Sequence, residues 1–175
     1  MKLLRLNTQA FKLPLASLLF ALFFLFAQQH VQAQSPLIIG TYKAKVNPDQ
    51  NVCVKIYGRE FEQILSMQYS LRWDTEQLKF KNISNFGLPK LSAQNFGTQR
   101  AEEGILTFAW YDPNLQGISK ADGSILYEVC FEVVGAKGTS TKLEFANEPT
   151  IIEVSKAPGT LIELQTEGGK VEILE

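Results

Sequence analysis

Apolar and polar side chains alternate strictly along one stretch near the middle of the chain. From Met67 to Trp73 every odd-numbered side chain is apolar, and the three side chains between them are polar. Successive side chains of a β-strand point to opposite faces of a sheet, so this pattern predicts a strand with one buried face and one polar face. Asp74 and Thr75 predict a turn after the strand, and Leu78 then returns an apolar group to the core.

A second stretch with the same design runs over Ile105–Pro113. Large apolar side chains alternate there with smaller or polar ones, and the inward set is Leu106, Phe108 and Trp110. Each of the two strands carries an indole on its apolar side, so both tryptophans are predicted to pack in a core. Two such strands indicate the middle of a β-sandwich.

Further strand signals follow one another at regular intervals, as in an all-β sandwich. No convincing helix is predicted, although a turn is expected near Pro89–Ala93. The predicted strands, nine in all, are Leu37–Val46, Asn51–Gly58, Gln63–Trp73, Phe80–Ile83, Ala93–Thr98, Ile105–Tyr111, Ser124–Val134, Lys142–Ala146 and Gly169–Leu174.

The N-terminal segment has the pattern of a secretory signal peptide. Three basic residues precede or open an apolar run that ends at Ala27, and small residues stand at Val31 and Ala33. The run, about fifteen residues long, is short for a membrane span, which needs about twenty. We therefore expect a signal peptide over 1–33, cleavage after Ala33, and one secreted domain over 34–175 without a membrane span. An uncleaved anchor is the alternative.

Charge and residue usage exclude several functions for that domain. Three of the 17 basic residues lie in 1–33, which leaves 14 basic against 18 acidic residues and a net charge near −4. No basic cluster is present, which argues against a nucleic-acid partner. The single histidine, His30, leaves with the signal peptide. Neither a histidine-dependent catalytic triad nor a histidine-ligated zinc is then available, and we expect no enzyme activity, cofactor or metal.

Paired carboxylates are the remaining route to hydrolytic chemistry. Glu102 and Glu103 are expected in a loop, pointing apart, and Glu128 and Glu132 on an outward strand face. Both pairs are interpreted as solvated surface and not as the acid and base of a glycosidase.

The order of these segments resembles the cohesin domain of cellulosome scaffoldins. The stretches that carry the resemblance are VNPDQNVCVKIYG, MQYSLRWD with LKF, GILTFAWYDP, GIS with ADGSILYEVCFEVVG, and GGKVEIL. In the turn after the central strand, Trp73 replaces the tyrosine of the family and Thr75 replaces its proline. The resemblance covers almost all of 34–175, and it rests on joint order and spacing.

The resemblance implies a nine-stranded jelly-roll β-sandwich and a non-catalytic function. A flat face of four strands would bind the helical dockerin of a secreted protein, such as a polysaccharide-degrading enzyme. Dockerins carry a calcium loop, and the nearest match here, Asp49-Gln50-Asn51, lacks the remaining ligands. The chain is therefore expected to be the receptor in such a pair.

Transferring the docking face of the family to this sequence selects the outward side chains of two strands and their flanks. The alternative is that this face is simply solvated. The selected residues are Ser66, Gln68, Ser70, Arg72, Thr107, Ala109, Tyr111 and Asp112, flanked by Lys142 and Glu144.

Polysaccharide binding is the competing hypothesis, because cohesins are structurally akin to carbohydrate-binding modules. Sugars stack on exposed aromatic rings, and the candidates for exposed rings are Tyr57, Tyr42, Phe61 and Phe96. These rings are scattered along the sequence, which favours a protein partner.

The two cysteines form an even pair in an oxidising compartment. Cys53 and Cys130 lie on the outward sides of their strands, which are neighbours in the second sheet of the family. Pairing of Tyr57 beside Leu126 would bring the two cysteines opposite each other. A cross-strand disulfide is one interpretation, and two free thiols are the other.

Overall fold

The computed structural model describes residues 36–175, and almost all regular structure in this part is β-strand. Fourteen strands are present, with two single turns of 3-10 helix, η1 (Ala93–Asn95) and η2 (Ala101–Glu103). The strands are β1 (Leu37–Thr41), β2 (Ala44–Val46), β3 (Asn51–Arg59), β4 (Ile64–Arg72), β5 (Leu78–Ser84), β6 (Phe96–Gly97), β7 (Ile105–Tyr111), β8 (Ser124–Val133), β9 (Ser140–Lys142), β10 (Glu144–Ala146), β11 (Glu153–Lys156), β12 (Thr160–Ile162), β13 (Leu164–Glu167) and β14 (Lys170–Ile173).

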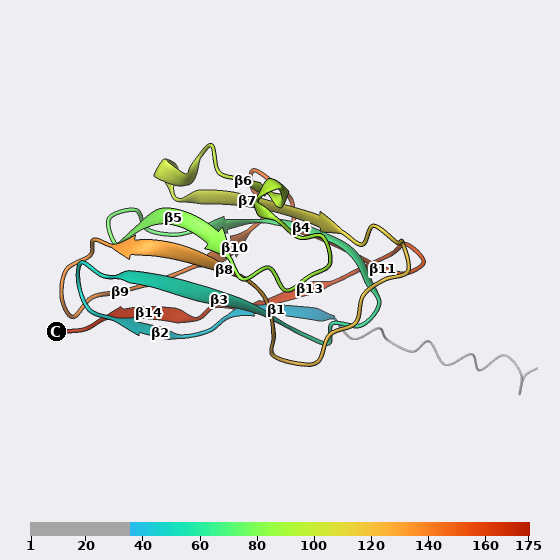
Figure 1. Cartoon of the computed structure of the whole chain (residues 1–175), viewed down its shortest axis with the longest axis horizontal. Coiled ribbons are helices and arrows are strands. Elements are labelled where there is room, and N and C mark those ends of the chain that lie inside the picture. Colours follow the sequence, from blue (N-terminus) through green and yellow to red (C-terminus); the bar gives the residue numbers. More distant parts are fainter. Residues whose placement is uncertain (1–35) are drawn as a thin grey trace, which may run out of the picture. The chain divides into compact units, whose positions relative to one another are not determined.

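The strands form two large sheets and one small one. One large sheet has the order β13-β1-β3-β8-β5, and the other has the order β12-β11-β4-β7-β6. β10 also pairs with β4, next to the residues that pair with β11. Figure 1 shows β8, β3 and β1 side by side in one layer, and β4 and β7 together in the other. The small sheet, β2-β14-β9, lies in neither order. The fold is a β-sandwich, as the sequence predicts.

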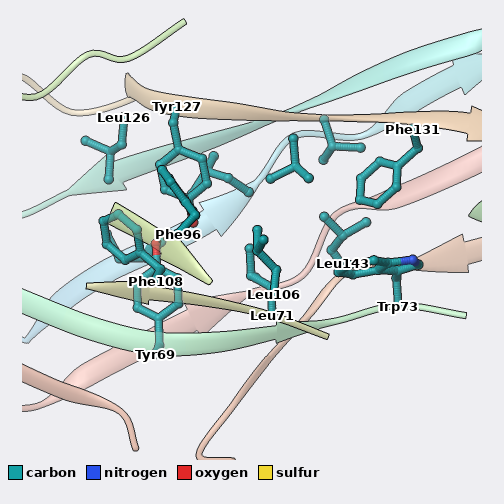
Figure 2. Packing of buried hydrophobic residues seen from close by; sticks show 14 of the residues in the cluster. Tyr69, Leu71, Trp73, Phe96, Leu106, Phe108, Leu126, Tyr127, Phe131 and Leu143 are labelled. Carbon is teal, nitrogen blue, oxygen red and sulfur yellow. Dashed lines mark hydrogen bonds between the residues drawn. The ribbon is translucent and has the colours of Figure 1, made fainter. Parts of the chain in front are cut away.

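The core is filled by the alternating side chains that the sequence marks as inward. Met67, Tyr69 and Leu71 of β4 are at most 1% exposed, and Trp73 and Trp110 are 7% and 3% exposed. Figure 2 shows Tyr69 and Phe108 from one sheet meeting Tyr127 from the other. Each buried indole N–H has a partner, because that of Trp73 donates to the Leu78 carbonyl and that of Trp110 to the Pro89 carbonyl.

Several element boundaries differ from the predicted ones. The predicted strand Leu37–Val46 divides into β1 and β2, which belong to different sheets, and Lys142–Ala146 divides into β9 and β10 in the same way. The predicted strand Ala93–Thr98 is a 3-10 turn followed by the two residues of β6. β11, β12 and β13 were not predicted, because strands of three or four residues are too short to show a clear alternation.

Two of the four rings expected at the surface are in the core. Phe61 is 0% exposed and Phe96 is 7% exposed, whereas Tyr42 is 42% exposed and Tyr57 is half-buried. Phe96 packs against Phe108 and Tyr127, with centroid distances of 5.0 and 4.9 Å. Its expected exposure was wrong because β6 follows a 3-10 turn, so strand alternation does not set the direction of its ring.

Cys53 and Cys130 are joined by a disulfide and are direct partners in the β3–β8 register. The register expected around them differs at one end. Tyr57 lies opposite Ile125 and not Leu126, because a bulge follows Ile56. A bulge places two residues of one strand against one of its partner, so Leu126 is the extra residue.

The expected signal peptide and its cleavage after Ala33 lie outside the described residues. From Pro36 onward, no helix has the length and apolar character needed to cross a membrane.

Candidate docking face

The polar sides of β4 and β7 form the exposed surface of one sheet. Each outward residue of β4 pairs with a residue of β7 on one side and with a residue of β10 or β11 on the other. The outward side chains therefore form rows that run across the strands. We call this surface the β4–β7 face. It is formed by Ser66, Gln68, Ser70 and Arg72 of β4, Thr107, Ala109 and Tyr111 of β7, Ala146 and Glu144 of β10, Glu153 and Ser155 of β11, and Leu161 of β12.

One row of this face has polar residues at its centre and large apolar residues at its ends. Ser66 pairs with Tyr111 on one side and Ser155 on the other, and Ser155 pairs with Leu161. The hydroxyl oxygens of Ser66 and Ser155 are 2.7 Å apart. Tyr111 is 63% exposed and Leu161 is 66% exposed. At the usual strand spacing the two ends of the row are about 14 Å apart.

The next row is flat and contains no large apolar side chain. Gln68 pairs with Ala109 of β7 and Glu153 of β11. Ala109 is exposed, and its carbonyl accepts a hydrogen bond of 2.9 Å from Asn95 Nδ2. A helix of ordinary diameter, about 10 Å, can approach the sheet closely at Ala109, the one small side chain of this row.

Ser70 lies on the predicted side of β4 but is not accessible. It is 0% exposed, because the segment between β10 and β11 passes over it. Thr150 N–H donates to Ser70 Oγ at 2.9 Å, and Ser70 Oγ donates to the Thr150 carbonyl at 3.1 Å. The expectation that Ser70 contacts a partner directly is therefore wrong. The residue fixes the 147–152 segment, which presents Ile151 at 56% exposure.

Asp112 is also placed differently from the expectation. Its side chain is 0% exposed, and its carboxylate accepts hydrogen bonds from three backbone N–H groups of the loop after β7. These donors belong to Asn114, Gln116 and Gly117, at 3.1, 3.0 and 3.0 Å. A buried carboxylate needs such partners. Asp112 therefore holds the loop beside Tyr111 and offers no surface of its own.

The two flanking residues lie in different sheets. Glu144 of β10 pairs with Arg72 of β4, so it belongs to the β4–β7 face. Lys142 of β9 pairs with Lys170 of β14 in the small sheet, because the chain changes sheets at Leu143. Lys142 and Arg72 still line one cleft of about 560 Å³ at this end of the face. Glu103 lines the same cleft, and its pKa is lowered by a hydrogen bond and the charge of Arg100.

Sequence reasoning identified Tyr111 and missed two further exposed apolar residues, in the part of the chain that pairs with or covers β4. Leu161 lies on a three-residue strand, and Ile151 lies in the segment that Ser70 anchors. The available signal was a group of branched apolar residues in a region without clear strand alternation, namely Ile151, Ile152, Val154, Leu161, Ile162 and Leu164. Tyr111 and Leu161 offer apolar contacts at the two ends of the Ser66 row, and Ile151 offers another on the segment that covers Ser70.

The side chains of the β4–β7 face are suited to non-covalent binding. Between Pro36 and Glu175 no group of three or more histidine, cysteine, aspartate or glutamate side chains is arranged to hold a metal ion. Hydroxyl, amide and guanidinium groups supply hydrogen bonds, and the exposed Tyr111, Leu161 and Ile151 supply apolar area.

The whole sandwich matches one known domain family. A sequence model of the Cohesin domain matches residues 37–171. The chain belongs to the cohesin family. The predicted resemblance is thereby confirmed, and with it the β-sandwich class. No curated protein matches the sequence.

Solved cohesin structures share the fold at low sequence identity. The cohesin of a type I cohesin–dockerin complex from Clostridium thermocellum is 14% identical, with a TM-score of 0.68 over 80% of this chain and 100% of that chain. A non-cellulosomal cohesin from Archaeoglobus fulgidus is 21% identical, with a TM-score of 0.64 over 81% of this chain and 93% of that one. A type I cohesin from Pseudobacteroides cellulosolvens gives 18% and 0.63, over 79% and 92%.

Proposed function

We propose that this cohesin is a secreted, non-catalytic binding module that recruits a dockerin-bearing protein through the β4–β7 face. The observation that carries the proposal is the arrangement of that face, where the exposed Ala109 lies on a largely polar surface and Tyr111 and Leu161 are exposed at the two ends of one row. Related cohesins are described in complexes with dockerins, which supports this class of partner. The proposed cargo is a polysaccharide-degrading enzyme.

The small residues and the large apolar residues of the face have separate roles in this proposal. The small side chains of Ala109 and Ser66 let a partner helix come close, and each exposed apolar residue adds buried area. Complete burial of a leucine, isoleucine or aromatic side chain contributes roughly 1.5–3 kcal/mol. Because few residues carry most of the energy of an interface, Tyr111 and Leu161 are expected to dominate. Arg72 at the end of the face adds charge complementarity to an acidic group of the partner.

The test is capture of partners from the culture medium of the host, with the domain 34–175 as bait. We expect the wild type to retain a dockerin-bearing protein and Ala109→Arg to lose it, because a long charged side chain then projects from the β4–β7 face. Leu161→Ala is expected to weaken binding roughly tenfold. Asn51→Arg is the matched control, since it places the same side chain on an exposed strand position of the opposite sheet.

Two results would count against the proposal. One is a bait that retains no protein with a dockerin. The other is an Ala109→Arg variant that binds as well as Asn51→Arg, which would show that the partner uses a different surface.

A further inference from the structure

A second surface, on the sheet opposite the β4–β7 face, combines an exposed aromatic ring with lysines. Tyr42 lies between β1 and β2 and is 42% exposed. A hollow of about 420 Å³ on one side of it includes Lys43 and Lys55 in its lining. Another of about 430 Å³ includes Lys43, Tyr57, Glu167 and the Gly168–Gly169 backbone. We call the two hollows, with Tyr42 common to both, the Tyr42 site.

The aromatic part of the site is held in place by its neighbours. The Tyr42 hydroxyl donates to the Gly123 carbonyl at 3.3 Å, and the Tyr42 ring lies 4.5 Å from that of Tyr57. Tyr57 in turn lies over Gly40, where a Cβ atom would come within 2.4 Å of the ring. Rings fixed in this way lose little conformational freedom when a ligand stacks on them.

The polar groups of the second hollow are equally fixed. Glu167 accepts a hydrogen bond of 2.7 Å from the Tyr57 hydroxyl and is paired with Arg59. Its charge is therefore already matched, and its carboxylate keeps lone pairs for further donors. The adjacent Gly168 has no side chain, and a Cβ atom placed there would have no neighbour closer than 3.9 Å. Gly168 is exposed, whereas Gly169 is buried against Thr41 and Tyr42 and its N–H donates to Thr41 Oγ1, so a ligand can reach this loop only at Gly168.

The two lysines are the unmatched charges of the site. Neither Lys43 nor Lys55 forms an ion pair with any residue of the described part of the chain. Lys55 has Glu128 as its cross-strand neighbour, but the Glu128 carboxylate accepts a hydrogen bond of 3.0 Å from Asn85 instead. A site with a fixed aromatic ring, two unpaired ammonium groups and a matched carboxylate favours an anion that also carries an apolar ring face.

We propose that the Tyr42 site binds an acidic polysaccharide. A uronate residue stacks its ring on Tyr42, and its carboxylate contacts Lys43 and Lys55. Its hydroxyl groups donate to Glu167 and to the carbonyl of the exposed Gly168. This activity does not depend on the proposed recruitment of a dockerin, because it uses the other sheet of the sandwich.

The experiment is titration calorimetry of the domain 34–175 with oligomers of galacturonate, of mannuronate and guluronate, and of glucuronate. Each acidic oligomer is compared with its methyl-esterified form, which keeps the sugar and removes the charge. We expect at least one acidic oligomer to bind and its ester to bind about tenfold more weakly. The affinity should fall when salt is raised from about 0.02 M to about 0.3 M, because the contacts are exposed.

Variants assign the binding to the Tyr42 site. The Lys43→Gln/Lys55→Gln double variant is expected to lose roughly tenfold in affinity at low salt. Its control is Lys79→Gln/Lys81→Gln, which removes the same charge from β5 at the other edge of the same sheet. Tyr42→Ala should lose about tenfold because stacking is lost.

The lysine double variant keeps the test valid if Tyr42→Ala fails to fold, since exposed lysine ends do not pack in the core. The proposal is overturned if none of the acidic oligomers binds, or if the esters bind as tightly as the acids. Equal losses in the two lysine double variants would also overturn it, because general charge attraction would then explain the binding.

Discussion

Tyr69 and Tyr127 meet across the interior of the sandwich, where their hydroxyl oxygens are 2.8 Å apart. Both side chains are 0% exposed, so each hydroxyl depends on the other for its hydrogen bond. Burial raises the pKa of both phenols. The pair links β4 in one sheet to β8 in the other, which makes it a specific polar contact within an otherwise apolar core (Figure 2).

Removing one hydroxyl of this pair should cost more than removing both. We expect Tyr69→Phe to lower the free energy of unfolding by about 1–3 kcal/mol, because the Tyr127 hydroxyl is left buried without a partner. The Tyr69→Phe/Tyr127→Phe double variant should lie closer to the wild type. Urea denaturation of the single and double variants at pH 7 measures this coupling, and additive losses would contradict it.

The same pair predicts a dependence on alkaline pH. The pKa of each phenol is raised in the folded state above its ordinary value near 10. The stabilisation is therefore complete well below pH 10 and is lost as the pH rises through the unfolded value towards the raised folded ones, because the unfolded chain releases these protons first. Between about pH 9 and pH 11 the wild type should lose stability more steeply than the double variant.

Individual side chains show where residue-level prediction succeeds and where it fails. Alternation placed Tyr69 and Trp110 in the core, because strand geometry alone decides the direction of a side chain. It placed Ser70 on the outward side as well, but it could not show that Thr150, eighty residues later, covers it. Asp112 follows the last residue of β7, and only the folded loop shows that its carboxylate accepts hydrogen bonds from three backbone N–H groups.

The β3–β8 pair is joined by the Cys53–Cys130 disulfide, which closes a loop with a sequence separation of 77 residues. A cross-link of this length restricts the unfolded chain and typically contributes about 2–4 kcal/mol. We expect Cys53→Ala/Cys130→Ala to lower the urea midpoint for this reason. Alkylation of both thiols in the unreduced wild type would show that no bridge forms in the protein.

At the scale of elements, the long strands could be predicted and the short ones could not. β3, β4, β7 and β8 have seven to ten residues each, enough to show which side chains face the core. β11 pairs with β4 and with β12. These short strands form because of contacts with distant parts of the chain, which the local sequence does not show. The same limit applied to the candidate site, because Leu161 and Ile151 lie in this region.

The assignment of the whole molecule to the cell exterior depends on the signal peptide expected over 1–33. If it is cleaved after Ala33, the secreted protein should begin at Gln34. The Cys53–Cys130 disulfide is consistent with this route, because such bonds persist in oxidising compartments. N-terminal sequencing and intact mass of the protein from the culture medium test the expectation. A protein that retains residues 1–33 and fractionates with membranes would support the uncleaved anchor instead.

Ala33→Pro is the matched variant for this test. It should slow removal of the signal peptide without altering the sandwich, so the precursor should accumulate while the folded domain still binds its partner.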